Sequence, residues 1–344
     1  MGTSERRVSV KSGRSKLLKW DDFFMEKIPI HASDVISRAA KTLIDGHLVA
    51  FPTETVYGLG ADATNEEAVS RIFAAKGRPT DHPLIVHIPS TNRLDIWASD
   101  IPDYALALAG KFWPGPMTLI LKRKEIAKDY ITGGQDSVGL RVPAQREALE
   151  LLNEFEKLGG FGIAAPSANR FGAVSPTTAQ AVQEEIGDYL EVSDLILDGK
   201  KSFIGVESTI IDCTSEAPVI LRPGAITQEM VKQFINLDLK THLVKNKTKT
   251  SGLLQSHYSP KARIRLGEIA KEMEGFIAMA NIPTPMGAIR LASPKTNDEY
   301  AYELYSALRL ADQNGIETIA VILPENLGIG EAICDRLIKA AYKI

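Results

Sequence analysis

Residues 76–87 read "KGRPTDHPLIVH" and join a helical pattern to an apolar strand pattern. The preceding stretch "NEEAVSRIFAAKG" (65–77) has its apolar residues at helical spacing, which predicts a helix that ends at Gly77. The following stretch "PLIVHI" (83–88) predicts a buried strand. Lys76 and Arg78 lie at the junction, so the stretch alone is compatible with a cationic surface loop or with a ligand site at the mouth of a strand.

The same mixture of patterns continues on both sides of this junction. Helices are expected in "ASDVISRAAKTLIDG" (32–46) and "REALELLNEFEKLG" (146–159). Strands are expected in "HLVAFPT" (47–53), "MTLILK" (117–122), "VGLRVP" (138–143), "FGIAAPS" (161–167), "DLILDG" (194–199), "ESTIID" (207–212) and "PVILRPG" (218–224). Because strands and helices do not alternate one by one, residues 28–236 are predicted to form an α/β domain with a twisted, mixed, open sheet.

The character of the chain changes after this region. The polar stretch "THLVKNKTKTSGLLQSHYSP" (241–260) has no sustained period, which predicts a linker over 237–261. Residues 262–344 alternate strand and helix patterns, with a helix expected in "GEIAKEMEGFIAMA" (267–280). They predict a smaller, three-layer α/β domain of Rossmann-like pattern, without the GxGxxG turn that would give it a nucleotide of its own.

Composition limits the classes of protein. The 344 residues carry 40 Lys and Arg against 43 Asp and Glu, so contact with nucleic acid would need a local basic patch. No run of about 18 apolar residues is present, which argues against a membrane span. Cys213 and Cys334 lack CxxC spacing, which argues against zinc and disulfide frameworks and favours the reducing cytoplasm. Residues 1–27 are predicted to be a disordered basic arm; a vector-derived remnant is an alternative, and a transit peptide is disfavoured because an apolar face is missing.

Small hydroxylic residues and cations gather where the predicted strands end. Lys76, Arg78, Arg141 and Arg222 each lie beside such an end, and crevices that bind ligands in open α/β sheets lie at strand ends. Taken singly, each hydroxyl is an ordinary turn residue. Together with four cations, they would suit a polyphosphate and a carboxylate.

Several standard catalytic motifs are missing from the sequence. It contains no GxxxxGK[ST], no GxSxG and no HExxH, so a nucleotide would be held by side chains and no protein nucleophile is evident. Positioning and electrostatic stabilisation remain, as in phosphoryl and nucleotidyl transfer. Glu54 and Glu207 could position a donor or pair with an arginine.

The motifs taken in order resemble a known family. "FPTETVYGLGADAT" (51–64), "KGRP" with "HPLIVHI" (76–88), "FWPGPMTLIL" (112–121), "VGLRVP", "APSANRFGAVSPTT" (165–178), "GVESTIID" (205–212) and "ILRPG" (220–224) resemble the YrdC-like family of threonylcarbamoyl-AMP synthases. The resemblance covers about residues 30–235, and the linker "SGLLQSHYSP" with the C-terminal module resembles the longer, two-domain members. It implies that L-threonine, bicarbonate or CO2, and ATP form threonylcarbamoyl-AMP and pyrophosphate. The product would pass to a tRNA threonylcarbamoyl transferase that modifies tRNAs reading ANN codons.

The resemblance also implies roles for individual residues. Lys76 and Arg78 would be catalytic, and no residue is expected to bind metal, since Mg2+ would be held mainly by the ATP phosphates. The residues implied around L-threonine are Thr55, His87, Arg141, Ala165 and Ser208. Those implied around ATP are Arg78, His82, Ser137, Ser167, Asn169, Ser175, Arg222 and Tyr258, with Tyr258 part of a lid. His82 departs from the family pattern, which has Asn there.

Two other readings stay open at this point. An RNA-binding groove without catalysis would use the same cations, although the balanced charge and the lack of interleaved aromatics count against it; a weak contact with tRNA is compatible with either reading. A carbamoyltransferase-like domain of the hydrogenase-maturation kind is disfavoured, because the chain has no acylphosphatase-like segment and no zinc-finger cysteines.

Overall fold

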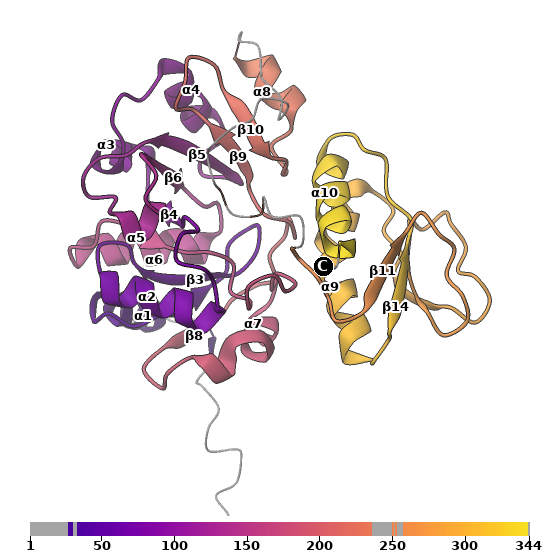
Figure 1. Ribbon diagram of the computed structural model, residues 1–344. Helices are drawn as coiled ribbons and strands as arrows, with labels where there is room; N and C mark the ends of the chain where they lie inside the picture. Colours follow the sequence, from indigo (N-terminus) through magenta and orange to yellow (C-terminus); the bar gives the residue numbers. More distant parts are fainter. Residues whose placement is uncertain (1–26, 30–32, 236–249, 251, 253–256, 343–344) are drawn as a thin grey trace, which may run out of the picture.

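The computed structural model describes residues 27–29, 33–235, 250, 252 and 257–342, and two sheets organise them (Figure 1). The basic arm up to residue 26 and most of the predicted linker lie outside the described residues. Along the part of the chain that is described, no helix combines the length and the apolar character needed to cross a bilayer.

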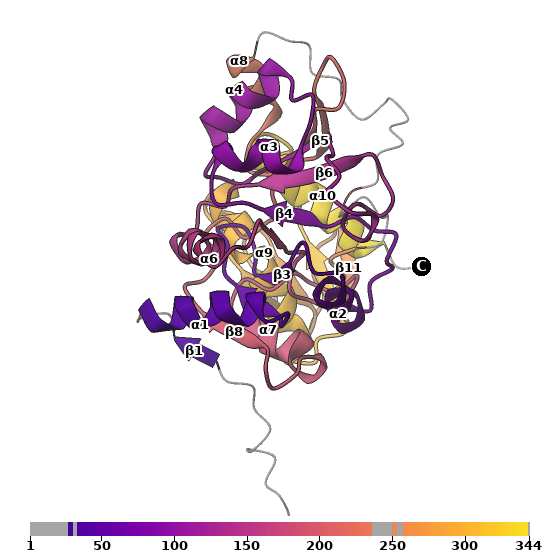
Figure 2. The same ribbon diagram turned by 90° about the vertical axis from the view of Figure 1, so that its left-hand side faces the viewer.

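The larger sheet has ten strands in the order β1-β8-β2-β3-β7-β4-β6-β5-β9-β10. Their bounds are β1 Lys27–Pro29, β2 Val49–Phe51, β3 Gly58–Asp62, β4 Ile85–His87, β5 Met117–Lys122, β6 Ser137–Arg141, β7 Ile163–Ala164, β8 Leu195–Asp198, β9 Thr209–Asp212 and β10 Val219–Arg222. The β4–β6 and β5–β9 pairs are parallel, whereas β2–β3 and β5–β6 are antiparallel. Figure 2 shows the strands from β8 to β5 running one above another across the domain. The prediction of a mixed open sheet is confirmed.

Helices cover both faces of this sheet. They are α1 Ser33–Ile44, α2 Glu66–Lys76, α3 Leu94–Trp97, α4 Asp103–Phe112, α5 Asp129–Thr132, α6 Arg146–Lys157, α7 Ala179–Ile186 and α8 Gln228–Phe234. Alternate residues of β2 point to opposite faces, as strand geometry requires. Val49 and Phe51 pack with α1 and α6, whereas Ala50 joins the core under α2, α3, α4 and α7. The predicted helices at α1, α2 and α6 are confirmed, and the remaining ones were not predicted.

The C-terminal sheet is small and entirely parallel, in the order β11-β14-β12-β13. Its elements are β11 Arg263–Leu266, β12 Gly275–Ile277, β13 Ile289–Ala292, α9 Asn297–Gln313, β14 Thr318–Val321 and α10 Ile329–Ala341. The prediction of a second, smaller α/β domain is confirmed. The helix expected in 267–280 is wrong, because Met273 has a left-handed φ of 64° and β12 begins at Gly275.

The loss of that helix changes the number of layers. Both described helices of the C-terminal domain, α9 and α10, lie on the face of the sheet that is turned toward the first domain (Figure 1). The domain therefore has two layers where the sequence pattern predicted three.

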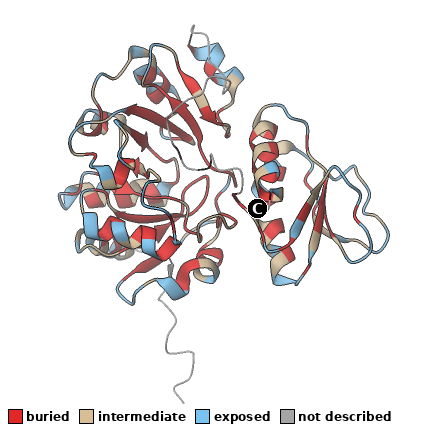
Figure 3. Cartoon of the chain, viewed as in Figure 1, coloured by how far each residue is buried: buried red, intermediate tan, exposed pale blue. Residues whose placement is uncertain are grey.

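The two domains pack closely along α9 and α10. At Gly205, an added Cβ would come within 2.3 Å of the carbonyl oxygen of Ala301, so glycine is required for this approach. Val56, Val174 and Val206 of the first domain belong to the same buried cluster as Tyr300 and Leu304 of α9. Buried residues accordingly face one another across the contact (Figure 3). The C-terminal domain is packed against the loops that end the first domain's strands.

Candidate active site

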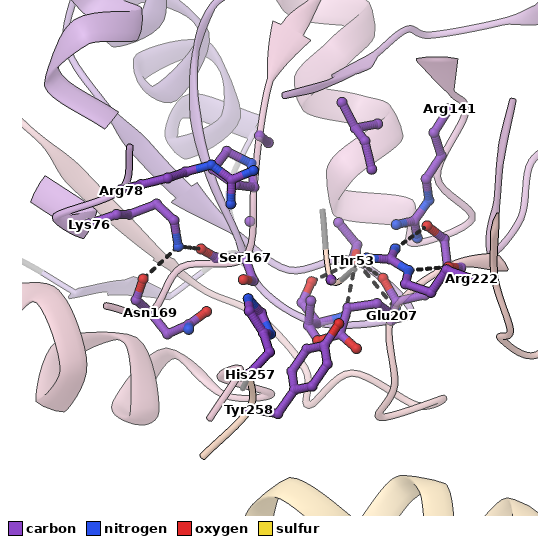
Figure 4. Close-up of a pocket in the computed structure, with 18 of the residues that line it drawn as sticks. Thr53, Lys76, Arg78, Arg141, Ser167, Asn169, Glu207, Arg222, His257 and Tyr258 are labelled. Atoms are coloured by element: carbon purple, nitrogen blue, oxygen red, sulfur yellow. Dashed lines mark hydrogen bonds between the residues drawn. The ribbon is translucent and has the colours of Figure 1, made fainter. Parts of the chain in front are cut away.

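A pocket opens where strands of the larger sheet end, and side chains from several separate segments line it (Figure 4). The residues that line it are Thr53, Thr55, Val56, Gly58, Lys76, Arg78, Ile85, His87, Arg141, Ala165, Pro166, Ser167, Asn169, Phe171, Glu207, Ser208, Arg222, Gly252, His257 and Tyr258. The predicted convergence of Lys76, Arg78, Arg141 and Arg222 on one crevice is therefore observed.

Lys76 is the last residue of α2 and enters the pocket because the helix stops there. Gly77 caps the helix with a left-handed φ of 60°, and its N–H donates to the carbonyls of Ala74 and Phe73. The Lys76 Nζ then donates to the carbonyl oxygens of Ser167 and Asn169, both at 2.6 Å. Among the described residues no carboxylate lies within ion-pairing distance of this ammonium.

Arg78 follows the same helix end and lies beside Lys76. Its Nη2 donates to the carbonyl of Pro83 at 3.0 Å, and its guanidinium lies 5.7 Å from the centre of the Phe171 ring. Burial lowers the pKa of Arg78 to about 10. Burial, and then the charge of Arg78, hold the pKa of Lys76 well below its usual value. We call Lys76, Arg78, Ser167 and Asn169 the lysine side of the pocket.

His87 and Arg141 end neighbouring parallel strands and are register partners in β4 and β6. The Arg141 Nη2 lies 2.7 Å from the Glu54 Oε1 and forms a buried ion pair with it, at an angle that is not a hydrogen bond. Burial, and then the charge of Arg141, lower the pKa of His87 to about 3, so this imidazole is neutral at physiological pH.

Ser208 and Arg222 are joined by hydrogen bonds at the ends of β9 and β10. The Arg222 Nε donates to the Ser208 carbonyl at 3.0 Å, and its Nη2 donates to the Ser208 Oγ at 3.1 Å. The same Oγ shares a hydrogen bond of 2.8 Å with the Thr118 hydroxyl of β5. Glu207, the preceding residue, is a second buried carboxylate. We call Glu54, Arg141, Glu207, Ser208 and Arg222 the carboxylate side.

His257 and Tyr258 lie between the two sides (Figure 4). They belong to the predicted linker over 237–261, which we call the connecting segment. The Tyr258 ring is 4.1 Å from the ring of His257 and stacks on Tyr305 at 6.0 Å. Tyr258 has a φ of 63°, which is rare for an aromatic residue and costs about 1–3 kcal/mol. The surrounding contacts stabilise this strained conformation, in which Tyr258 is 1% exposed.

Several buried polar atoms around the pocket make no hydrogen bond to any described residue. They are His87 Nδ1, Arg141 Nε, Arg141 Nη2, Asn169 Oδ1, His257 Nδ1 and Tyr258 Oη. Buried polar atoms almost always have partners in folded proteins, so a group of them around one cavity indicates a site that a polar ligand completes.

Most of the residues predicted for the site line this pocket. Those that line it are Thr55, Lys76, Arg78, His87, Arg141, Ala165, Ser167, Asn169, Ser208, Arg222 and Tyr258. His82, Ser137 and Ser175 do not. His82 lies behind the lining, edge-on to Phe171 at 5.3 Å. Ser137 is the first residue of β6 and lines a smaller, neighbouring cavity, to which Ile85 also contributes. Ser175 is buried and donates to the Glu207 Oε1 at 2.6 Å.

Glu54 and Glu207 were expected to position a donor or to pair with an arginine, and both pair with an arginine here. Other residues of the lining were not predicted for the site. Phe171 and His257 stand inside the quoted motifs "ANRFG" and "HYSP", so proximity to the assigned residues was the available signal. The partners of Glu207 in α9 and α10 carried no sequence signal, because they lie about a hundred or more residues away.

The described acidic residues near the pocket are paired with arginines: Arg141 pairs with Glu54 and Arg336 with Glu207. Within the described residues, no group of three or more His, Cys, Asp or Glu side chains is arranged to bind an ion.

Fold and site together define a two-domain α/β protein with a pocket whose lining includes four cations, a lining suited to an anionic ligand. Family models agree with this class: the Sua5/YciO/YrdC model, described as "Telomere recombination", matches residues 41–224. The model described as "Threonylcarbamoyl-AMP synthase, C-terminal domain" matches residues 226–342.

Similar proteins carry the same assignment over almost the whole chain. The threonylcarbamoyl-AMP synthase of Pyrococcus abyssi is 42% identical over 327 residues, covering 89% of this chain and 94% of that protein. The synthase of Bacillus subtilis is 37% identical over 332 residues, covering 89% and 92%. The crystal structure of P. abyssi Sua5 complexed with L-threonine has a TM-score of 0.81 at 39% identity, covering 92% of this chain and 96% of that one. This chain belongs to the threonylcarbamoyl-AMP synthase family, in its two-domain form, which confirms the resemblance predicted from the motifs.

Proposed function

We propose that this protein joins L-threonine, bicarbonate or CO2, and ATP into threonylcarbamoyl-AMP with release of pyrophosphate. The observation that carries the proposal is the pocket itself, where four cations surround one cavity together with several polar atoms that make no hydrogen bond to any described residue. Membership of the synthase family and the L-threonine complex of the related P. abyssi protein support the choice of substrates.

The lysine side binds the triphosphate of ATP. Lys76 and Arg78 have main-chain carbonyls as hydrogen-bond acceptors, and carbonyls do not cancel their positive charge. That charge stabilises the triphosphate and the negative charge that develops on the leaving pyrophosphate. Ser167 and Asn169 complete this side, and Tyr258 covers it from the connecting segment. Mg2+ enters as part of the MgATP substrate.

The carboxylate side binds L-threonine. Arg141 offers its Nε and Nη2 to the threonine carboxylate, and the neutral His87 offers its Nδ1 to the amino group. Thr55, Ala165 and Ser208 surround the rest of the amino acid. Arg222, which is hydrogen-bonded to Ser208, borders both ligands. Ser175 acts through Glu207, because it lies outside the lining; His82 and Ser137 also lie outside it and have no direct role in this assignment.

The reaction then proceeds in two bond-forming steps. The unprotonated amine of threonine adds to CO2 and gives a carbamate, with one proton released. A carbamate oxygen attacks the α-phosphorus of ATP while the bond to the β-phosphate oxygen breaks, and pyrophosphate leaves. Holding both substrates in one buried pocket supplies the orientation that these steps require and keeps water from the reactive mixed anhydride.

The product supplies a tRNA-modifying transferase in the cytoplasm. A mixed anhydride hydrolyses in water, so a transferase that modifies tRNAs reading ANN codons must consume it soon after release. Cys213 and Cys334 are both buried free thiols, which suits a reducing compartment. A weak contact with tRNA at the pocket entrance would help this transfer.

Pyrophosphate release tests the proposal. Incubation with MgATP, L-threonine and bicarbonate should release pyrophosphate only when all three are present. If pyrophosphate is released at none of the Mg2+ concentrations tested, the proposal is overturned. Release that continues without threonine would indicate a different acceptor.

A further inference from the structure

Glu207 is the point at which the C-terminal domain reaches the pocket. Its Oε1 accepts from the Ser175 hydroxyl at 2.6 Å, and both of its oxygens accept from the Tyr305 hydroxyl of α9, at 3.1 and 2.9 Å. Its Oε2 also accepts from the Arg336 Nε of α10 at 2.8 Å. Two of its three partners therefore come from the other domain.

The charge balance at Glu207 depends on that other domain. Burial alone would raise the pKa of Glu207, but the charges of Arg336 and Arg222 and the bonds from Ser175 and Arg336 lower it to about 2. The carboxylate is therefore ionised, buried and held in a fixed orientation.

Arg336 is buried together with Glu207, with its side chain 0% exposed. Its Nη1 donates to Asp335 at 2.6 Å, and its Nη2 donates across the domain boundary to the Pro223 carbonyl at 3.1 Å. The guanidinium also lies 5.2 Å from the centre of the Tyr258 ring. One arginine of α10 thus contacts Glu207, Tyr258 and the residue that follows Arg222.

The next turn of α10 holds the connecting segment. The Lys339 Nζ donates to the carbonyl of Gly252 at 2.7 Å, and the Lys339 carbonyl accepts from the His257 N–H at 3.3 Å. Gly252 lies so close to Tyr258 that an added Cβ would be 2.4 Å from its hydroxyl oxygen. Helix α10 therefore holds both described pocket-lining parts of the segment.

We propose that Arg336, assisted by Tyr305, is a positioning residue for the reaction. By fixing Glu207 it sets the main chain of Ser208, and Ser208 in turn fixes Arg222 through two hydrogen bonds. The C-terminal domain then completes the threonine site from behind without touching the substrate. This inference rests on the proposed function, because it concerns the binding of that function's substrate.

If Arg336 only stabilised the fold, its substitution would change the kinetic constants in a different way. Unfolded molecules lower the concentration of active enzyme, and hence the apparent kcat, but they leave the KM of the folded molecules unchanged. A positioning role instead raises the KM for L-threonine, since the folded molecules bind it less well. The KM measured well below the unfolding temperature separates the two roles.

The experiment compares variants of the full chain at saturating MgATP and bicarbonate. Arg336→Gln should raise the KM for L-threonine about tenfold, and Arg336→Lys, which keeps the charge beside Glu207, should recover part of the loss. Tyr305→Phe removes only the hydroxyl and should raise the KM about threefold; it keeps the test available if Arg336→Gln does not fold.

Arg290→Gln is the matched control within the same domain. Arg290 donates to the carbonyls of Ala278, Ile282 and Ala292. No first-domain residue is among its hydrogen-bond partners in the described structure. Its substitution should lower the unfolding temperature and leave the KM unchanged. If the KM for L-threonine stays within twofold of the parent value in both Arg336→Gln and Tyr305→Phe, the positioning role is overturned.

Calorimetry separates this inference from the proposed function. The dissociation constant of L-threonine, measured without turnover, should rise in Arg336→Gln by the same factor as the KM. A parent chain that binds threonine but releases no pyrophosphate would overturn the proposed reaction while still testing the positioning role. A parent chain that binds no threonine would overturn both.

Discussion

The two sides of the pocket differ in what lies next to their positive charges: main-chain carbonyls on the lysine side and carboxylates on the carboxylate side. On the lysine side, Lys76 donates to two main-chain carbonyls and its charge is not cancelled by any carboxylate within ion-pairing distance among the described residues. On the carboxylate side, Arg141 pairs with Glu54, and Arg336 pairs with Glu207.

The difference matches the charges of the two proposed substrates. A triphosphate brings several negative charges, so the side that binds it gains from cations whose charge is uncompensated. Threonine is a zwitterion without net charge, so its side needs fixed donors and acceptors in a nearly neutral setting. The substitutions below test this contrast.

The largest effect is expected at Lys76. Lys76→Met should lower kcat/KM by about a hundred- to a thousandfold, because a preorganised charge at the leaving group is lost. The same change should keep or raise the unfolding temperature, since it removes a buried ammonium that has no carboxylate partner among the described residues. Pyrophosphate release and thermal unfolding measure the two outcomes.

Lys157→Met is the control for this change, because the Lys157 side chain is 72% exposed on α6 and does not line the pocket. Lys157→Met should change neither kcat/KM nor the unfolding temperature. A clear fall in the unfolding temperature of Lys76→Met would contradict the contrast between the two sides.

On the carboxylate side, unlike at Lys76, removing a charge should destabilise the fold. Glu54→Gln leaves Arg141 as a buried charge without compensation, which should lower the free energy of unfolding by about 3–5 kcal/mol. Adding Arg141→Met to this variant should recover much of that stability, although threonine binding should not return. Urea unfolding of the single and double variants measures both steps. A loss below about 1 kcal/mol for the single variant would show that the pair is not a tight buried one.

A smaller effect is expected from pH. The pKa of His87 falls to about 3 on burial, against 6.5 in the unfolded chain. Below pH 6.5 the unfolded state therefore binds a proton that the folded state does not. Its contribution to stability is complete above pH 6.5 and is lost as the pH falls toward 3, by about 1.4 kcal/mol per pH unit. His87→Gln should remove up to about 2 kcal/mol of the stability difference between pH 7 and pH 5 in urea unfolding. An unchanged difference would contradict the neutral, buried state of His87.

The smallest effect is expected at His82, which has no place in the pocket lining. It packs edge-on against Phe171, so His82→Asn should leave turnover the same or slightly higher. A loss of orders of magnitude in ATP-dependent turnover would show that His82 contacts the nucleotide. The dependence of turnover on pH should also be the same in His82→Asn as in the parent chain near neutrality.

Much of this arrangement could be predicted from sequence because it is local. The α2 helix ends at Gly77 for a reason visible in the sequence, and that ending brings Lys76 and Arg78 to the mouth of β4. Arg141 was predicted beside a strand end and His87 within a predicted strand, and the two are register partners in the neighbouring strands β6 and β4. Ser137 lies on the same face of β6 as Arg141 but four residues earlier, beside a neighbouring cavity, and Ser175 lies in a loop; how far the pocket extends along the strand and which side of the loop faces it are not determined by local pattern.

The remaining features depend on contacts between distant segments. The helix expected in 267–280 has suitable spacing, but the left-handed Met273 and the pairing of β12 with β14 outweigh its local preference. The bond from Arg336 to Glu207 joins residues 129 positions apart across two domains. A single sequence carries no periodic signal for such a pair.

In the proposed reaction, a carbamate of threonine attacks the α-phosphate of ATP in this pocket. Incubation with 14C-bicarbonate and α-32P-ATP, followed by chromatographic separation of the products, tests this step. We expect one threonine-dependent species that carries both labels, formed together with pyrophosphate and lost in Lys76→Met. Formation of ADP and phosphate, or 14C in a species without 32P, would contradict it.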